Sequence, residues 1–326
     1  LFCLDAILPH IKNLESEKSY SNRENIMERM PAISLAAVPG RRSATLDLAV
    51  ETEKKGFTGI FCPSLGDSMA LSQALALVTK EIVFGTSIMP IYFRQIFDHA
   101  SSASFIHETS NGRFRFGVGV SHGPALKAKG LRGGKPLSDI RSFVSELKEA
   151  PRVGELPPII LAAMRKKMIA LAGEIGNGMV FANAARSHMQ ESLDVLSAST
   201  KNDMSFFIGN MIPTCISDDV EAAKAVNRKT LTSYAMLPNY RNYWKEAGYL
   251  EEMEGIEKAI EAKEFDRIPH FLTDTWLRDT TLFGNSTSVR DGVEAWFDSG
   301  IKTPILVPSS VRGGQMLAFE DLFSIF

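Results

Sequence analysis

The sequence predicts an α/β fold of the (β/α)₈ barrel type, on three observations. From Ala32 onward, short β-type runs alternate with amphipathic helical segments. Eight such β-type runs can be counted, which is the number that a closed barrel needs. Strict alternation of strand and helix also favours parallel strands joined by right-handed crossovers.

The expected strands are short runs rich in β-branched, aromatic or other apolar residues. They are residues 33–38, 59–62, 82–89, 114–120, 159–162, 179–181, 206–213 and 304–307. Helical spacing is clear in residues 46–55, where Leu46, Ala49 and Val50 share a face and Gly56 stands at the position of a C-cap. The other expected helices are residues 71–78, 96–109, 140–148, 167–174 and 189–199.

One connection, between Pro213 and Thr303, is about twice as long as an ordinary βα unit. It contains an aromatic segment at residues 234–249 and an acidic helix around residues 251–263. Two interpretations stay open for this insertion between the seventh and eighth strands. It either lies on the active face of the barrel or is a helical excursion that only buries apolar surface.

Residues 1–30 precede the first expected strand and are interpreted as an N-terminal extension, separate from a barrel domain at residues 31–326. The extension begins with Leu1 and carries Asp5 in its first apolar run. It has neither a basic leader nor a small-residue cleavage site, so it does not resemble a signal peptide.

Composition excludes several classes of function. Lys and Arg total 36 against 38 for Asp and Glu, a net charge of −2, which disfavours a nucleic-acid partner. The apolar runs are too short to span a membrane. The three cysteines form no CxxC pair and no HExxH motif is present, so neither a metal site nor a disulfide framework is expected. A cytoplasmic location is the simplest expectation.

The segment at residues 112–124, GRFRFGVGVSHGP, is the most informative for chemistry. Alternation places its apolar side chains, at Phe114, Phe116, Val118 and Val120, toward the surrounding helices. Gly117 and Gly119 then face the barrel axis, and paired glycines indicate that some group approaches the backbone closely. The alternative is that they only relieve crowding inside the barrel.

Ser121 and His122 follow this strand, at the C-terminal end where barrel enzymes keep their working residues. The glycines do not form a dinucleotide fingerprint, because Gly117, Gly119 and Gly123 are spaced GxGxxxG and residues 121–136 are expected to form a loop rather than a helix. The run GGKP at residues 133–136 lacks the Ser or Thr of a phosphate-binding Walker A loop.

A possible phosphate site lies after the fifth expected strand. The strand ends near Ala162, a helix starts within a few residues, and its first amide groups lack intrahelical partners. Arg165, Lys166 and Lys167 stand at this positive helix end, where cations are unfavourable by about 0.3–1 kcal/mol each unless an anion is bound. The alternative is that these cations only point into water.

Together these segments resemble the luciferase-like flavin oxidoreductases, often called luciferase-like monooxygenases. The strongest match is GRFRFGVGVSHGP with the GKPL run at residues 134–137. The runs at residues 160–168 and 171–183 resemble the family's phosphate region and sixth strand. IVFGTSIMPIYFR, at residues 82–94, resembles its third strand, where many members have a non-prolyl cis peptide. The resemblance extends to the last strand near residue 307.

The resemblance implies where the cofactor binds. Thr86, Ser87 and Ile88 would lie behind its ring, and Gly119, Val120, Ser121 and His122 would border it. The amides of Ala162, Ala163 and Met164 would hold its phosphate. Two residues depart from the family pattern: Met164 stands where many relatives have a small residue, and Val120 stands near the position of an arginine in luciferase.

The resemblance also implies an oxidoreductase whose cofactor is FMN or an 8-hydroxy-5-deazaflavin coenzyme. FMN would mean monooxygenation of a small organic substrate, and a deazaflavin, which the GVSHGP run favours, would mean hydride transfer. His122 is the candidate catalytic residue, to hydrogen-bond the ring or donate a proton. The resemblance and the apolar stretches 69–78 and 96–106 predict a homodimer.

Two alternatives come from other classes of protein. One is a flavin-binding protein without catalytic activity, which the sequence alone does not distinguish from an enzyme. The other is a metal-free barrel lyase or aldolase that works through a lysine Schiff base. None of the eight expected strands ends in a lysine, so the lyase is the weaker alternative.

Overall fold

The computed structural model describes residues 29–326, so the predicted N-terminal extension falls almost wholly outside it. Residues Pro31–Phe326 form one compact unit. Its sheet has ten strands, and all of their pairings are parallel. Eight of them form a closed barrel because β10 pairs with both β1 and β8. The barrel strands are β1 (Ala32–Ser34), β2 (Gly59–Cys62), β3 (Val83–Thr86), β5 (Phe114–Gly119), β6 (Ile159–Ala162), β7 (Gly178–Ala182), β8 (Phe207–Ile216) and β10 (Thr303–Ser309).

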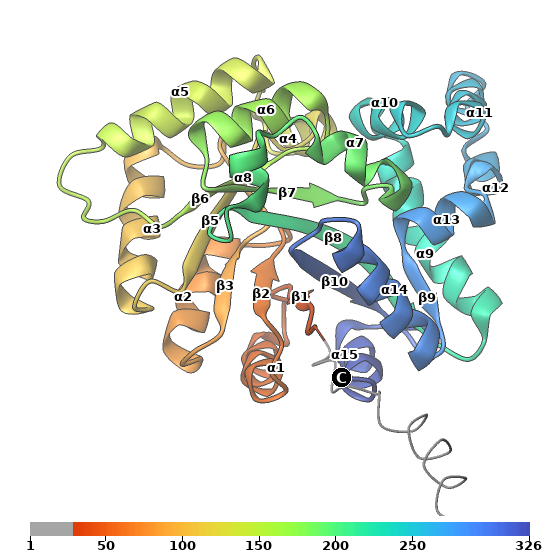
Figure 1. Cartoon of the computed structure of the whole chain (residues 1–326), viewed down its shortest axis with the longest axis horizontal. Coiled ribbons are helices and arrows are strands. Elements are labelled where there is room, and N and C mark those ends of the chain that lie inside the picture. Colours follow the sequence, from red (N-terminus) through yellow and green to blue (C-terminus); the bar gives the residue numbers. More distant parts are fainter. Residues whose placement is uncertain (1–28) are drawn as a thin grey trace, which may run out of the picture. The chain divides into compact units, whose positions relative to one another are not determined.

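Helices follow the strands and surround the sheet (Figure 1). The predicted (β/α)₈ barrel is therefore confirmed. No helix in residues 29–326 is both long and apolar enough to cross a membrane. The helices around the barrel are α1 (Arg42–Lys54), α2 (Ser68–Val78), α3 (Ile96–Thr109), α4 (Gly123–Ala128), α5 (Pro136–Glu149), α6 (Lys166–Ile175), η1 (Arg186–His188), α7 (Met189–Leu193), α8 (Ala198–Asn202), α9 (Val220–Ala235), α14 (Ser286–Asp298) and α15 (Gln315–Phe323).

The predicted insertion forms a group of short helices beside β8 and α9 (Figure 1). Its interior is aromatic, with Trp244 and Trp276 in edge-to-face contact at 4.8 Å between ring centroids. The elements of this connection, besides α9 and α14, are α10 (Pro238–Glu246), α11 (Leu250–Glu261), η2 (Phe265–Arg267), α12 (Ile268–Phe271), α13 (Asp274–Thr280) and the strand β9 (Leu282–Gly284).

Four details of the sequence prediction are wrong. The expected strand at residues 82–89 is interrupted at a cis peptide between Ser87 and Ile88, after which β4 (Met89–Pro90) pairs with β5. The expected helix at 189–199 is broken into α7 and α8, and the expected loop at 121–136 contains α4. The strand β9 was not expected, because its three residues pair only with an extension of β8.

The inside of the barrel is filled by apolar side chains that come from six of its strands. They interdigitate in one cluster of Ala32, Phe61, Ile160, Val180, Met211 and Ile305. Burial of such side chains contributes about 1.5–3 kcal/mol each for the larger ones, so this cluster holds the strands in register.

The outer face of β5 packs as its alternation predicts. Phe114 and Phe116 are fully buried, and the ring of His99 from α3 lies between Phe116 and Phe143 of α5. Burial lowers the pKa of His99 from 6.5 to about 4. The imidazole is therefore neutral in the folded protein over most of the pH range.

We expect His99 to make the protein sensitive to acid. Its pKa is lower in the folded than in the unfolded state, so the unfolded state takes up the proton first as the pH falls. The free energy of unfolding should therefore decrease between about pH 6.5 and pH 4, with a slope from this group of about 1.4 kcal/mol per pH unit. Urea unfolding of wild type and His99→Phe across this range is the measurement, and equal slopes in the two proteins would contradict it.

Candidate functional site

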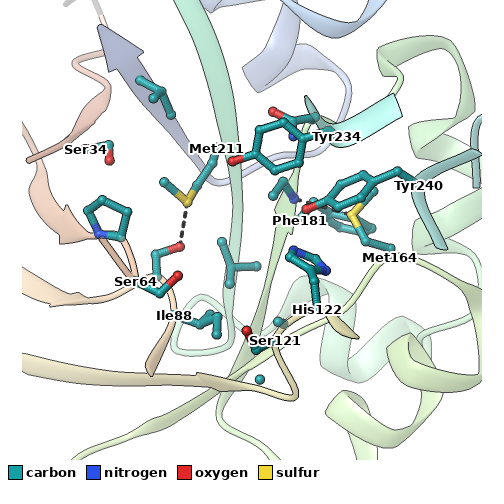
Figure 2. A pocket seen from close by; sticks show the side chains of 18 of the residues that line it. Ser34, Ser64, Ile88, Ser121, His122, Met164, Phe181, Met211, Tyr234 and Tyr240 are labelled. Carbon is teal, nitrogen blue, oxygen red and sulfur yellow. Dashed lines mark hydrogen bonds between the residues drawn. The ribbon is translucent and has the colours of Figure 1, made fainter. Parts of the chain in front are cut away.

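A cavity of about 820 Å³ opens at the C-terminal ends of the barrel strands. This size is typical of a site for a cofactor or a drug-sized ligand. All but one of the predicted cofactor residues line it, from the ends of three strands (Figure 2). They are Ser87, Ile88, Gly119, Val120, Ser121, His122, Ala162, Ala163 and Met164.

Thr86 is the residue that does not line the cavity. Its side chain is buried, and its hydroxyl donates a hydrogen bond to the carbonyl oxygen of Gly117 at 2.7 Å. Thr86 therefore ties β3 to β5 beneath the cavity. The next residue, Ser87, is the one that reaches it.

Gly117 and Gly119 of β5 are required to be glycine for different reasons. A Cβ on Gly117 would lie 1.8 Å from the carbonyl oxygen of Thr86, so the close approach is made by the neighbouring strand. Gly119 lines the cavity, and a Cβ there would lie 2.9 Å from Ala162 and 3.1 Å from Ile88. Crowding inside the barrel, the alternative weighed for both positions, thus accounts for Gly117, while Gly119 also shapes the cavity.

His122 lies against Tyr240, with 5.5 Å between ring centroids (Figure 2). Ser121 precedes it with a φ of +62°, a turn that directs the chain from β5 into α4. Burial lowers the pKa of the His122 imidazole. The neutral form is thus favoured, which suits hydrogen bonding or proton acceptance better than donation from an imidazolium.

In the predicted phosphate region, two of the three cations are paired with carboxylates. The Arg165 guanidinium pairs with Glu246 of α10, and the Lys166 ammonium lies 2.6 Å from a carboxylate oxygen of Glu191. Both cations therefore have carboxylate partners, so their position does not require a bound anion. Their side chains are exposed, and such surface pairs contribute little stability.

The backbone at this junction is partly engaged as well. The Ala163 N–H donates to the carbonyl oxygen of Val180 at 3.0 Å, as part of the barrel ladder, and is not free for a ligand. No described residue accepts a hydrogen bond from the N–H groups of Met164 or Arg165, and both residues line the cavity. Donors for an anion therefore remain, one and two residues beyond the predicted position.

The insertion contributes the side of the cavity opposite to β3. Thr230 and Tyr234 of α9 and Asn239 and Tyr240 of α10 line it. Tyr234 and Tyr240 are in edge-to-face contact at 5.1 Å (Figure 2). The interpretation that the insertion lies on the active face is therefore correct, although Tyr243, Trp244 and Trp276 are buried in its own interior. The aromatic run at residues 234–249 was the signal for these two tyrosines.

Besides Ser87, several polar residues that line the cavity were not singled out from the sequence. Figure 2 shows Ser34 and Ser64 on the side of β1 and β2. Ser87 donates a hydrogen bond to the sulfur of Met211 at 2.9 Å. Gln315, from the start of α15, exchanges two hydrogen bonds with the backbone of Ala36. Ser87 was predicted from its place at a strand end, whereas Ser34, Ser64 and Gln315 come from parts of the chain far apart in the sequence, and no local pattern marks them.

The cavity has few groups that can transfer protons. Of the described residues that line it, none is Asp or Glu. Burial raises the pKa of the Tyr234 and Tyr240 phenols, so both stay protonated. His122 is thus the one lining side chain that can accept a proton near neutral pH.

Comparisons with known proteins give the following matches. The sequence profile of a family described as luciferase-like monooxygenase matches residues 30–150 and 138–303. A 5,10-methylenetetrahydromethanopterin reductase of Methanolobus tindarius is 23% identical over 205 residues, which is 53% of this chain and 61% of the relative. The chain thus spans less than two thirds of the length of that relative.

Two solved structures are similar in fold. A coenzyme F420 dependent tetrahydromethanopterin reductase from Methanopyrus kandleri superposes with a TM-score of 0.72 at 15% identity, over 90% of this chain and 97% of that chain. The oxygenating constituent of 3,6-diketocamphane monooxygenase from Pseudomonas putida, in complex with FMN, has a TM-score of 0.57 at 16% identity, over 85% and 91% of the two chains.

Proposed function

Because the chain belongs to the luciferase-like monooxygenase family, we propose that it is a flavin- or deazaflavin-dependent oxidoreductase acting on a small organic molecule. The observation that carries this proposal is the cavity at the C-terminal ends of the strands. It gathers Ser87, Ile88 and the residues from Gly119 to His122, which are the positions that the family resemblance assigns to the cofactor.

The residues present fit a flavin-type ring. Ile88 and Ala162 fill the place that a side chain on Gly119 would take, and the three residues form an apolar part of the cavity wall that suits an aromatic ring. The N–H groups of Met164 and Arg165 would donate hydrogen bonds to its phosphate, in place of the amide of Ala163, which already donates to Val180. The bound cofactor would supply the redox chemistry, and the protein would supply binding, orientation and proton transfer.

We favour a deazaflavin over FMN, and hydride transfer over monooxygenation. The support is the sequence run GVSHGP together with the reductases among the proteins that this chain resembles. In that reaction the neutral His122 would accept the proton of a substrate hydroxyl, or hydrogen-bond the corresponding oxygen.

Titration with cofactors tests the proposal. We expect FMN, or an 8-hydroxy-5-deazaflavin coenzyme, to bind tightly and neither NADH nor NADPH to do so, since the glycines lack the dinucleotide spacing. Fluorescence of the ligands during titration is the measurement, and the tighter of the two flavins identifies the cofactor. Tight binding of NADPH alone would refute the proposal. Steady-state turnover with the reduced cofactor separates an enzyme from a flavin-binding protein without activity.

We also propose a homodimer that buries the outer face of α2 and α3. These helices pack on one another, and large apolar side chains on them are exposed: Leu77 by 75%, Phe97 by 54% and Phe105 by 52%. Exposed large apolar side chains on two neighbouring helices are typical of an interface between subunits. Light scattering at micromolar concentration should give twice the mass of the chain, and Phe97→Ser with Phe105→Ser should give the single mass. A monomeric wild type would contradict the proposal.

A cytoplasmic location is proposed on the state of the thiols. Cys62 and Cys215 are both buried and free of disulfide bonds in the described part of the chain. Burial raises the pKa of the Cys62 thiol to about 12, so it stays protonated and unreactive. Free thiols are typical of proteins in a reducing compartment.

A further inference from the structure

Tyr240 is a buried residue of α10 that lines the cavity, with 4% of its surface exposed. Its ring lies among three others, with centroids 5.1 Å from Tyr234, 5.5 Å from Trp244 and 5.5 Å from His122. Trp244 is itself fixed by a hydrogen bond from Nε1 to the carbonyl oxygen of Asn183 at 3.0 Å. Figure 2 shows the Tyr240 ring reaching from α10 to a place beside His122. The direction of the Tyr240 phenol is thus set by packing on several sides.

The hydroxyl of Tyr240 has no hydrogen-bond partner among the described residues. Two other phenols of the insertion do have one. Tyr243 accepts from the N–H of Ala185 at 3.2 Å, and Tyr249 donates to a carboxylate oxygen of Asp279 at 2.8 Å. Because the Tyr240 hydroxyl is also not among the unpartnered polar atoms that are fully covered, it is open to the cavity. Burial raises the pKa of this phenol, so it keeps its proton and serves as a hydrogen-bond donor.

His122 offers the complementary group beside this phenol. Its side chain likewise has no hydrogen-bond partner among the described residues, and burial favours its neutral form, which has one acceptor nitrogen. A ligand hydroxyl can donate to that nitrogen and accept from the Tyr240 phenol through a single oxygen atom. The lining cation, Arg165, is paired with Glu246, and no Asp or Glu of the described chain lines the cavity. No charged side chain therefore competes for that oxygen.

We propose that Tyr240 is a second catalytic residue, whose phenol donates a hydrogen bond to the substrate oxygen that gives its proton to His122. This inference rests on the proposed function, because it takes His122 as the proton acceptor of that reaction. As the proton passes to the imidazole, negative charge develops on the oxygen, and a fixed donor in a site shielded from water stabilises that charge. The phenol keeps its own proton throughout. The insertion therefore contributes to the chemistry as well as to the wall of the cavity.

The first test removes the hydroxyl alone and measures binding of two probes of similar shape, cyclohexanol and methylcyclohexane. Ligand-observed NMR follows their binding to the full chain loaded with its flavin. Tyr240→Phe keeps the ring and should weaken cyclohexanol binding about five- to tenfold, the effect of one neutral hydrogen bond, without changing that of methylcyclohexane. Tyr243→Phe is the matched control from the same helix, because its hydroxyl serves the backbone of Ala185 and does not line the cavity. It should bind both probes as wild type does.

Turnover gives the catalytic part of the role. Loss of one donor to a developing oxyanion typically lowers kcat by about 100-fold or more, and we expect an effect of this size in Tyr240→Phe. The dissociation constant of the cofactor should stay as in wild type, and Tyr243→Phe should keep the wild-type kcat. Full activity in Tyr240→Phe, with His122→Ala inactive, would overturn the inference.

A spectroscopic measurement follows the Tyr240 phenol itself. The chain has six tyrosines, and ¹³C labelling at Cζ reports on the oxygen that this carbon carries. The Tyr240 signal, identified by its absence in Tyr240→Phe, should move on addition of cyclohexanol much more than on addition of methylcyclohexane. Equal cyclohexanol binding by wild type and Tyr240→Phe would contradict the inference. So would a Cζ shift caused fully by the flavin alone, which would assign the phenol to the cofactor. Neither binding readout needs turnover, so failure here with normal flavin binding leaves the proposed function standing.

Discussion

Replacing His122 by alanine should lower turnover by about 100-fold or more, while the cofactor still binds. A positioned acid or base contributes typically 10²–10⁴-fold to a rate, and His122 is the lining side chain suited to that task. Its loss leaves the other walls of the cavity in place. The measurement is steady-state turnover together with the dissociation constant of the cofactor.

The pH dependence should carry the signature of the same residue. Burial lowers the pKa of His122, so its neutral form persists to lower pH than in a free histidine. Turnover that uses the neutral imidazole should be constant near neutrality and fall only when the pH drops through this lowered pKa. The midpoint of the acidic limb should therefore lie below 6.5, and the limb should be absent in His122→Ala.

His107→Ala is the matched control for this prediction. His107 lies near the end of α3 and does not line the cavity, so its removal should change neither the rate nor the acidic limb. If His122→Ala keeps most of the wild-type rate, or keeps the acidic limb, the assignment of His122 as the catalytic residue is wrong.

The fold could be predicted because its signals are local. The helix at residues 96–109 was predicted to the residue, since its apolar spacing ends at the Ser-Asn-Gly run that starts the next turn. The strand β9 could not be predicted, because three residues are too few to show the alternation of a strand. Its pairing also depends on the extension of β8 beyond the barrel. The helix α4 is likewise only six residues long, too short to show a helical period in the sequence.

The site could be predicted where its residues stand at strand ends, and not where they come from elsewhere. His122 and Ser87 follow strands, and a barrel brings all strand ends to one face. Gln315 lines the cavity from the start of α15 and is hydrogen-bonded to the backbone of Ala36, 279 residues away, a contact that only the tertiary structure defines. The pairing of Arg165 with Glu246, 81 residues apart, is of the same kind. This pairing is not visible in the sequence, which left open whether the cations at the start of α6 hold an anion or only point into water.

Replacement of Gly117 should have the largest effect on the free energy of unfolding, because the fold requires a glycine there. Gly117 is buried in β5, where a Cβ would lie 1.8 Å from the carbonyl oxygen and 2.9 Å from the carbonyl carbon of Thr86. Both atoms belong to the backbone of β3, which is also held there by the hydrogen bond from the Thr86 hydroxyl to the Gly117 carbonyl oxygen. Relief of the clash therefore requires the two strands to separate.

We expect Gly117→Ala to lower the free energy of unfolding by about 3 kcal/mol or more, because overpacking against backbone cannot be relieved by a change of rotamer. Gly123→Ala is the control from the same segment. A Cβ there would have nothing within 4 Å, and alanine at the start of α4 should stabilise by a few tenths of a kcal/mol or be neutral. Urea unfolding followed by circular dichroism compares the two with wild type. If Gly117→Ala were as stable as Gly123→Ala, the close approach of β3 would not be what demands the glycine, and a ligand in the cavity would again be the better explanation for it.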